Sequence, residues 1–429
     1  MWQRLNNPVE SSRLQLSTEG AVDTTVLIIF AFVYVGMVLG EIPGLALDRT
    51  GVALLGAIAL LATEQVSPEE AWEAVDVSTI MLLFGLMVVS AQFRLGGFYT
   101  YLTRRLAAVE VPPDILLALL VAVAGVLSAL LANDIVCLAM APVLVEGCAR
   151  RRLDPVPFLL ALACAANVGS AATLIGNPQN MLIGQKLHLS FAGYLLDAGL
   201  PTVLGLGAVW WVIRQRTQGR WRKPTPLPQI TAPTFNLWQT GKGLFVIVLL
   251  VLVFLVTPWP HDVAALTAAG VLLTSRRMAS RDILGLVDWQ LLVLFVGLFV
   301  VNHALVASGM LSHLTAFVEA GGIHLQQPAW LFTVTVVLSN VISNVPAVML
   351  LLPMASHPFA GPILALASTL AGNLFLVGSI ANIIVVDQAA KLDVRITWQE
   401  HARVGIPVTL LTLILAAGWL WLRATWFLR

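Results

Sequence analysis

Three short polar stretches interrupt long apolar runs in this sequence, and their side chains have the chemistry to hold a small ion. They are Ala-Asn-Asp at 132–134, Gly-Asn-Pro-Gln-Asn at 176–180 and Ser-Asn-Val-Pro at 343–346. Asparagine and glutamine amides both donate and accept hydrogen bonds, so they suit either an anion or a cation. Asp134 is the one carboxylate in these stretches, and it can take up a proton or neutralise a cation. The pattern predicts an ion site within apolar surroundings.

The composition indicates what those surroundings are. Hydrophobic residues make up 58% of the chain, charged residues only 11%, and the mean hydropathy is +0.87. Soluble domains contain about 25% charged residues, so this chain is expected to be an all-α integral membrane protein. The net charge of +1 gives no reason to expect nucleic acid as a partner. No cofactor or resident metal is indicated, apart from a transported Na⁺.

Membrane-spanning helices need about 20 apolar residues, and the sequence predicts about ten of them. The candidate crossings are 24–40, 48–63, 77–93, 156–185, 191–213, 243–257, 263–275, 288–309, 362–390 and 404–422. Two further apolar segments, 113–148 and 328–355, carry polar residues at their centres. We expect these two to be re-entrant hairpins.

The distribution of lysine and arginine predicts the orientation of the chain. Most of the 24 basic residues fall in alternate loops, at 41–50, 94–112, 149–156, 214–242, 275–286 and 391–403. Cytoplasmic loops are enriched in Lys and Arg, so we place these loops in the cytoplasm and both termini outside. The predicted location is the plasma, or inner, membrane.

The segment 113–148 is flanked by basic loops on both sides, which predicts that it enters and leaves on the same face. Its second leg, from Ile135 to about Cys148, has about 14 residues and would be about 21 Å long. That length favours a re-entrant hairpin, and two full spans remain the alternative. Non-helical backbone at membrane depth must face protein or a water-filled cavity, so the hairpin tip should face a site.

The two halves of the chain repeat the same order of features. V-D-V-S-T-I-M-L-L-F-G at 75–85 aligns with V-D-W-Q-L-L-V-L-F-V-G at 287–297, and Asn133 aligns with Asn344. G-N-P-Q-N at 176–180 aligns with G-S-I-A-N at 378–382. Five crossings per half is an odd number, so the second copy is inverted. Inverted repeats with interrupted helices indicate a transporter's binding site.

These features divide the chain into a polar segment at 1–23, a first repeat at 24–213, a basic, proline-containing cytoplasmic linker at 214–242, and a second repeat at 243–429. The candidate substrate- and ion-binding residues lie at the hairpin tips and helix breaks: Asn133, Asp134, Thr173, Gly176, Asn177, Pro178, Gln179, Asn180, Ser339, Asn340, Ser343, Asn344, Gly378, Ser379 and Asn382. Asp134 is the candidate for coupling transport to an ion.

Each polar stretch also has a purely structural interpretation. Asn133 and Asp134 would form an aqueous turn if 113–148 were two spans. Asn344 would mark a helix kink at Pro346, and 176–180 would be a packing break. Three accidental features at matching repeat positions are a weaker explanation than one shared site. Asn302 and His303 align with Ser90 and Ala91, which are unremarkable, and we interpret Asn302 and His303 as structural.

The same stretches resemble the ion transporter superfamily with the citrate-transporter-like domain, over nearly the whole chain. This group includes arsenite permeases, NhaD-type sodium/proton antiporters, and di- and tricarboxylate permeases. A-N-D at 132–134 and S-N-V-P at 343–346 are similar to arsenite-permease hairpins, and A-A-T-L-I-G-N-P-Q-N at 171–180 is similar to the antiporter branch. Asn177 replaces that branch's usual Asp, and neither hairpin has the S-N-T motif of the dicarboxylate branch.

The resemblance implies an ion-coupled permease, not an enzyme, for a small inorganic or organic anion or an oxyanion-like solute such as arsenite. It also implies H⁺ or Na⁺ as the coupling ion, elevator-type alternating access and a homodimer within membrane lipid. Sodium/proton antiport and di- or tricarboxylate transport are the alternatives. An intramembrane enzyme is disfavoured because H-E-x-x-H and G-x-S-x-G motifs are missing from the sequence.

Overall fold

The computed structural model describes residues 24–42, 44–223, 226–228, 233–275 and 278–427, and these residues are mostly helical without a β-strand. The predicted polar segment 1–23 lies outside the described residues. The α-helices are α2 (Thr24–Leu39), α3 (Arg49–Ala62), α4 (Pro68–Ala74), α5 (Val77–Leu95), α6 (Phe98–Ala108), α7 (Pro113–Leu130), α8 (Asn133–Arg150), α9 (Pro155–Ser170), α10 (Pro178–Lys186), α11 (Phe191–Thr217), α12 (Leu237–Val256), α13 (His261–Leu273), α14 (Ser280–Leu284), α15 (Trp289–Ala307), α16 (Met310–Ala320), α17 (Pro328–Ile342), α18 (Asn344–Leu351), α19 (Ala360–Ala371), α20 (Ile380–Ala390) and α21 (Trp398–Phe427). Two 3₁₀ turns, Leu352–Met354 and Leu376–Gly378, follow α18 and precede α20.

Each predicted crossing coincides with a helix or a pair of helices. Among the described residues, six single helices are long and apolar enough to cross a membrane: α5, α7, α11, α12, α15 and α21. Others, such as α3 and α13 with 14 and 13 residues, are shorter than the roughly 20 residues that a perpendicular crossing needs. The chain is therefore a multi-pass membrane protein, and the count of ten crossings stays a prediction.

Two of the predicted crossings are broken in the middle. The segment 156–185 divides into α9 and α10 around an irregular stretch at 171–177, and the segment 362–390 divides into α19 and α20 around 372–379. Pro178 occupies the first turn of α10, where its missing N–H costs no hydrogen bond. Each break leaves backbone groups without helical partners, and side chains must satisfy them.

The first hairpin differs from its prediction in one respect. Its second leg, α8, has 18 residues, as many as α7, and would be about 27 Å long. The expectation of a short, 14-residue leg is therefore wrong. Helical structure starts at Asn133 and continues to Arg150, where the Arg150–Glu146 ion pair, one turn apart, supports the last turn. In the second hairpin, by contrast, α18 has only eight residues.

The order of helices is the same in the two halves. A short helix, a long helix, a surface helix, a hairpin, a broken pair and a long final helix occur in α4–α11 and again in α14–α21. The short helices α4, α6, α14 and α16 were not expected from the sequence. The linker between the halves is shorter than predicted because α11 continues to Thr217 and α12 starts at Leu237. The inverted relation between the halves stays a prediction.

One compact unit combines the described part of Met1–Val75 with Val296–Ile323. Small residues let its helices approach closely, since a Cβ atom on Gly297 would lie only 2.7 Å from the backbone carbonyl carbon of Ala53. The Tyr34 hydroxyl donates a hydrogen bond of 2.9 Å to Oδ1 of Asn302. Asn302 thus has a structural partner, in line with the structural interpretation given above.

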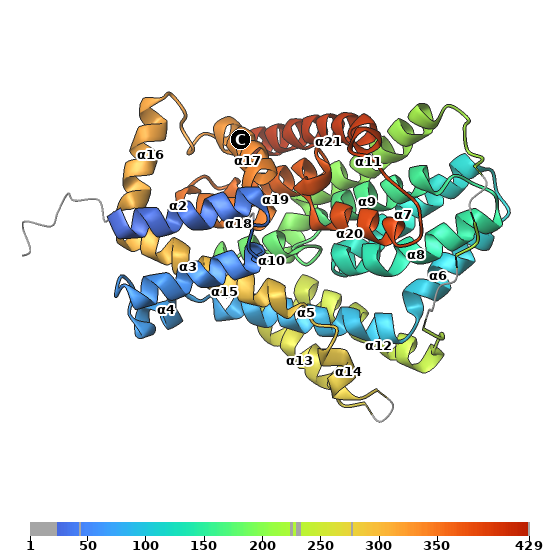
Figure 1. The fold of residues 1–429 in the computed structure, drawn as a ribbon, viewed down its shortest axis with the longest axis horizontal. Helices are drawn as coiled ribbons and strands as arrows, with labels where there is room; N and C mark the ends of the chain where they lie inside the picture. Colours follow the sequence, from blue (N-terminus) through green and yellow to red (C-terminus); the bar gives the residue numbers. More distant parts are fainter. Residues whose placement is uncertain (1–23, 43, 224–225, 229–232, 276–277, 428–429) are drawn as a thin grey trace, which may run out of the picture. The chain divides into compact units, whose positions relative to one another are not determined.

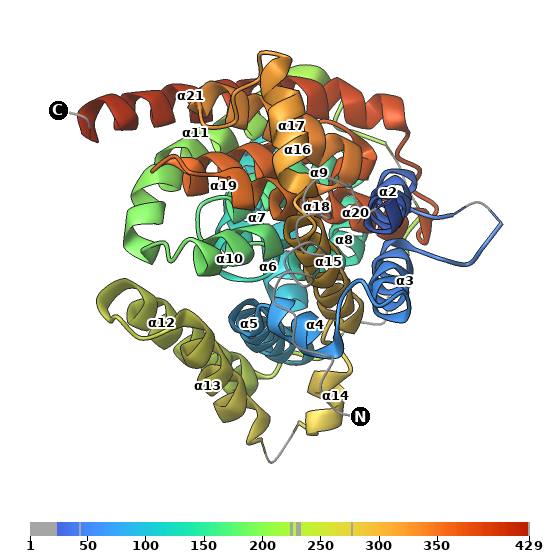
Figure 2. The ribbon, with the colours of Figure 1, turned by 90° about the vertical axis from the view of Figure 1, so that its left-hand side faces the viewer.

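The second compact unit combines Asp76–Phe295 with His324–Arg429 and holds both hairpins and both broken segments. In this unit α7 packs along α9, and α8 lies against α9 and α20 (Figure 1). Helices α5, α12 and α13 form a neighbouring group (Figure 2). The backbones of α7 and α9 touch, because a Cβ atom on Gly169 would lie 2.3 Å from the carbonyl oxygen of Gly125. The compact units therefore do not follow the two sequence halves.

An ion pair links the start of α5 to the end of α10. Nζ of Lys186 lies 2.7 Å from Oδ2 of Asp76, whose Oδ1 accepts the N-capping hydrogen bond from Thr79 N. Burial raises the pKa of the Asp76 carboxyl, but Lys186 and the Thr79 hydrogen bonds outweigh it and hold the pKa below its usual value.

We expect Asp76→Asn to lower stability by about 1 kcal/mol at neutral pH, because asparagine keeps the cap but loses the ion pair. A carboxyl with a depressed pKa stabilises the fold above its unfolded pKa and loses that contribution as the pH falls. The difference in melting temperature between variant and wild type should therefore shrink below about pH 4. A difference that is constant from pH 7 to pH 3 would contradict this assignment.

Candidate functional site

Four helices of the second compact unit start at polar residues of the predicted site. Helix α8 starts at Asn133 and α18 at Asn344, while Asn177 and Ser379 are the N-caps of α10 and α20. The Asn177 side chain accepts a hydrogen bond of 2.9 Å from Asn180 N, and Ser379 Oγ accepts one of 3.2 Å from Ala381 N. The N-terminal ends of helices carry free N–H groups and a positive partial charge. Such ends favour an anion.

Asn167, in the last turns of α9, connects the first hairpin to the second broken segment. Its side chain is 2% exposed. Its Oδ1 accepts hydrogen bonds from Asn133 Nδ2 at 3.2 Å and from Ser379 Oγ at 2.8 Å. Its Nδ2 donates to Oδ1 of Asn373 at 2.8 Å and to Oδ1 of Asn382 at 3.1 Å. One amide thus holds four polar groups, one from the first hairpin and three from the second broken segment.

Thr369, in α19, has the corresponding position in the other broken segment. Its Oγ1 accepts hydrogen bonds from Asn177 Nδ2 at 3.2 Å and from Gln179 Nε2 at 3.1 Å. It donates one of 3.4 Å to Oδ1 of Asn180. Asn180 also donates to the carbonyl oxygen of Thr173 at 3.0 Å and is fully buried.

These contacts are reciprocal under the repeat alignment. That alignment, which places Asn180 on Asn382, pairs the residues of the two breaks as follows: Asn167 with Thr369, Asn177 with Ser379, and Asn180 with Asn382. Asn167 of the first half contacts the break residues of the second, and Thr369 of the second contacts those of the first. Reciprocal contacts of this kind are what a two-fold relation between two copies produces.

The tip of the first hairpin lies against the first break. The backbone N–H of Asn133 donates to the carbonyl oxygen of Gly176 at 3.3 Å. The Thr173 hydroxyl donates to the carbonyl oxygen of Ala129, near the end of α7. A Cβ atom on Gly176 would lie 2.8 Å from the carbonyl oxygen of Ser128, in the last turn of α7. The tip can therefore approach the break only because residue 176 has no side chain.

The tip of the second hairpin lies against the second break. Ser343, which joins α17 to α18, has a φ of 77°, a backbone conformation that non-glycine residues rarely adopt. A Cβ atom on Gly372 would lie 3.2 Å from Nδ2 of Asn344. One on Gly378 would lie 3.2 Å from Oδ1 of Asn340. Both hairpin tips thus surround one group of broken helices.

Several buried oxygen atoms near the tips have no hydrogen-bond partner among the described residues. They are Oγ of Ser128 and Ser339, and Oδ1 of Asn133, Asn340 and Asn344. The alignment pairs Ser128 with Ser339 and Asn133 with Asn344, so the two halves leave matching atoms unpaired. Buried polar atoms without a partner are rare in native proteins. Amide oxygens in this condition can bind a cation or a solute hydroxyl group.

The predicted site residues therefore lie in one part of the second unit, although their surroundings differ. Asp134 follows Asn133 in the first turn of α8, is half-buried, and has no hydrogen bond or ion pair within the described part of the chain. Pro178 contributes only to the start of α10, and Asn340 donates to the carbonyl oxygen of Val336 in its own helix. That these residues bind a transported solute stays a prediction.

Sequence reasoning missed the two residues that connect the breaks, Asn167 and Thr369, as well as Asn373. The sequence did carry a signal for Asn167, since this amide interrupts an apolar run, and polar residues within membrane segments are usually functional. Thr369 could have been found by extending the alignment of the breaks upstream to Asn167. Asn373 aligns with Ala171 and carries no repeat signal.

Comparison with known proteins agrees with this architecture. The family model described as a citrate transporter matches residues 25–367. An uncharacterized transporter of Mycobacterium tuberculosis is 29% identical, over 88% of this chain and 94% of that protein. The silicon efflux transporter LSI3 of Oryza sativa subsp. japonica is 28% identical, over 86% of this chain and 92% of that protein. The Escherichia coli inner membrane protein YbiR is 31% identical, over 76% and 83%.

A solved structure has a similar fold. The YdaH transporter of Alcanivorax borkumensis superposes with a TM-score of 0.61, over 94% of this chain and 98% of that one, at 16% sequence identity. At this identity the similarity concerns the fold alone. The family match covers most of the chain, and several relatives are named as transporters. This chain therefore belongs to the citrate transporter family, as a multi-pass membrane transporter.

Proposed function

We propose that this protein is an ion-coupled secondary transporter of a small, oxyanion-like solute, and that the solute binds between the two hairpin tips. The observation that carries the proposal is the reciprocal network in which Asn167 and Thr369 hold the caps of the opposite broken helices. Matched interrupted helices are the usual position of a transporter's binding site. The start of α8 and the start of α18 would both face the solute.

The side chains of the network favour a weakly charged oxyacid as the solute. The network consists of amides and hydroxyl groups, and among the described residues no lysine or arginine contributes to its hydrogen bonds. A di- or tricarboxylate carries several negative charges and would need cationic partners. Arsenous and silicic acids are small polyhydroxylated solutes that exchange hydrogen bonds with amides. The name of the rice relative, a silicon efflux transporter, supports this class.

Asp134 is the proposed coupling group. It is adjacent to Asn133, whose amide joins the network through Asn167, and it has no cationic partner among the described residues. A carboxyl in this position can exchange a proton each time the site opens to water. The family resemblance adds elevator-type movement, a homodimer and a location in the inner membrane. Cytoplasmic basic loops would place both termini outside.

We expect Asp134→Asn to abolish uphill transport in proteoliposomes, because asparagine cannot bind and release a proton. The protein should stay folded, since the substitution preserves size and breaks no described hydrogen bond. The matched control is Asp387→Asn, which removes a carboxylate of α20 that is 53% exposed and paired with Lys391, the C-cap of that helix. The control should transport like the wild type. Undiminished uphill transport by Asp134→Asn would refute the coupling assignment.

A panel of solutes identifies the substrate class. Purified protein in vesicles would be tested for uptake of arsenite, silicic acid, sulfate and citrate, each with and without an imposed pH or sodium gradient. We expect pH-driven movement of arsenite or silicic acid and none of citrate. Gradient-driven citrate uptake would contradict the oxyacid assignment while leaving the family membership intact.

Sodium/proton antiport is the second candidate, and the unpaired Oδ1 atoms of Asn133, Asn340 and Asn344 favour it. Together with the Asp134 carboxylate they provide oxygen ligands of the kind that Na⁺ prefers. A pH-sensitive dye inside vesicles separates the two candidates. Alkalinisation or acidification on addition of sodium alone, without any oxyacid, would establish antiport as the main activity.

A further inference from the structure

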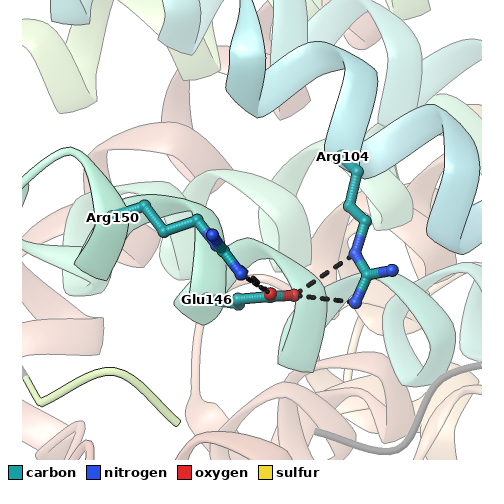
Figure 3. Close-up of polar contacts among 3 residues, drawn as sticks. All are labelled: Arg104, Glu146 and Arg150. Carbon is teal, nitrogen blue, oxygen red and sulfur yellow. Dashed lines mark hydrogen bonds and ion pairs between the residues drawn. The ribbon is translucent and has the colours of Figure 1, made fainter. Parts of the chain in front are cut away.

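Glu146, near the end of α8, is a buried carboxylate held between two arginines. Its side chain is 8% exposed, whereas those of Arg104 and Arg150 are 52% and 63% exposed. Arg150 donates from Nη2 to Oε1 at 2.8 Å, and Arg104 donates from Nη2 and Nε to Oε2 at 3.2 and 3.4 Å. Figure 3 shows the two guanidinium groups approaching the carboxylate from opposite sides. Helix α6 is thereby joined to the end of α8.

A cavity of about 720 Å³ opens beside this cluster. Three arginines line it, Arg104, Arg150 and Arg151, against two glutamates, Glu110 and Glu146, so its net charge is +1. The rest of the lining is apolar and comes from alanines, valines and a glycine of α6, the following loop and α8. The cavity thus combines excess positive charge with an apolar wall.

The arginines differ in how many donors they have available. Arg151 donates to the carbonyl oxygens of Val109 and Val111, at 2.9 and 2.7 Å, and so fixes the loop after α6. Arg104 and Arg150 each give Nε and Nη2 to Glu146. Within the described chain their Nη1 groups have no acceptor, although a guanidinium has five N–H donors. Both guanidinium groups therefore have unused N–H donors and line the same cavity. Such a pair can bind a phosphate.

The cavity is separate from the proposed solute site. Glu146 lies 13 positions after Asn133 in the same helix, which corresponds to about 20 Å along its axis. The corresponding helices of the second half, α16 and α18, contain no arginine. A feature present in one half only is not part of the repeated machinery around the helix breaks.

The position of the cavity favours a lipid as the ligand. Helix α6 buries Tyr99, Thr103 and Leu106 and exposes Tyr101 and Arg105, as expected for a helix at the membrane surface. The cavity lies between this helix and the basic end of α8, where the basic loops 94–112 and 149–156 predict the cytoplasmic face. Basic pockets on that face attract anionic head groups.

We infer that this cavity binds the phosphodiester head group of an anionic phospholipid, with Arg104 and Arg150 as the donors. A phosphodiester carries one negative charge and would neutralise the cavity, whereas inorganic phosphate near neutral pH is a mixture of the mono- and dianion and carries more than one negative charge on average. The apolar wall would accommodate the glycerol and the first methylenes of the acyl chains. This site does not depend on the identity of the transported solute.

The test counts the lipids retained by purified full-length protein in detergent, by native mass spectrometry, after addition of phosphatidylglycerol or phosphatidylcholine. We expect the wild type to retain phosphatidylglycerol preferentially. Arg104→Gln should lower that retention about five-fold, while Glu146→Gln, which raises the cavity charge by one unit, should increase it. Arg281→Gln removes an exposed arginine of α14, far along the chain from the cavity, and should leave retention unchanged.

Inorganic phosphate, added in large excess, distinguishes the two sources of the phosphate group. We expect it to displace little phosphatidylglycerol. Complete displacement by phosphate would assign the cavity to a soluble anion and overturn the lipid assignment. Equal retention of the two lipids, or equal retention by Arg104→Gln and Arg281→Gln, would overturn it as well. If Glu146→Gln does not fold, the Arg104 and Arg281 variants decide the question.

Discussion

Replacing Asn167 by alanine should reduce transport about 100-fold and lower the stability of the protein by about 3 kcal/mol or more. The amide makes four hydrogen bonds at 2% exposure, so its loss leaves Asn133, Ser379, Asn373 and Asn382 each without one partner. Each buried polar group left unsatisfied costs about 1–3 kcal/mol. The first hairpin tip and the cap of α20 would both shift, and displacement of a positioned group by about 1 Å can cost two orders of magnitude in rate.

The measurement pairs uptake into proteoliposomes with thermal unfolding in detergent. Asn302→Ala is the matched control, because it also truncates a hydrogen-bonded amide. Asn302 lies in α15 and is bonded to Tyr34 and Leu298, not to the network. It should lose some stability and keep its transport rate per folded molecule. Thr369→Val removes the reciprocal hydroxyl and should also reduce transport. Wild-type transport by folded Asn167→Ala would show that the network does not form the site.

The sequence was a good guide to the helices because the membrane imposes one strong rule. A segment that crosses lipid must be apolar over about 20 residues, and each predicted crossing coincides with one helix or a broken pair. The short helices α4, α6, α14 and α16 escaped prediction because they are too short to cross. The amphipathic pattern of α6 and α16 was hidden between longer apolar runs. The length of α8 was misjudged because Asn133 and Asp134 were assigned to the hairpin tip and Arg150 to the basic loop that follows. The helix in fact starts at Asn133, and the Arg150–Glu146 ion pair supports its last turn.

The site was predicted in its types of residue but not in its connections. Amides at matched breaks could be found from spacing, since Asn133, Asn344 and Asn382 each follow an apolar run. Which amide bonds to which depends on tertiary packing between segments about 200 positions apart. Asn167 lies in a helix without a sequence break, so its role becomes visible only when Ser379 is placed beside it. A repeat alignment predicts equivalent positions, and the fold determines which of them meet.

Glycine at the first break should be indispensable, and its counterpart at the second break should tolerate a methyl group far better. A Cβ atom on Gly176 would lie 2.2 Å from the carbonyl oxygen of Ser170 and 2.8 Å from that of Ser128. Both contacts are with backbone atoms, which cannot rotate away as the end of a side chain can. On Gly378 the nearest atoms, Oδ1 of Asn340 and the carbonyl oxygen of Gly372, would be 3.2 Å away.

We therefore expect Gly176→Ala to lower stability by about 4 kcal/mol, more than ordinary point mutations do, and to yield little folded protein. Gly378→Ala should fold with a loss of about 1–2 kcal/mol and transport more slowly, because it presses on the unpaired amide oxygen of Asn340. Gly207→Ala in α11 is the control, since a Cβ atom there meets nothing within 4 Å. Yield of monodisperse protein and melting temperature rank the three variants. Equal yields for Gly176→Ala and Gly207→Ala would mean that the first hairpin does not close on its helix break, and the binding pocket assigned to that junction would have to lie elsewhere.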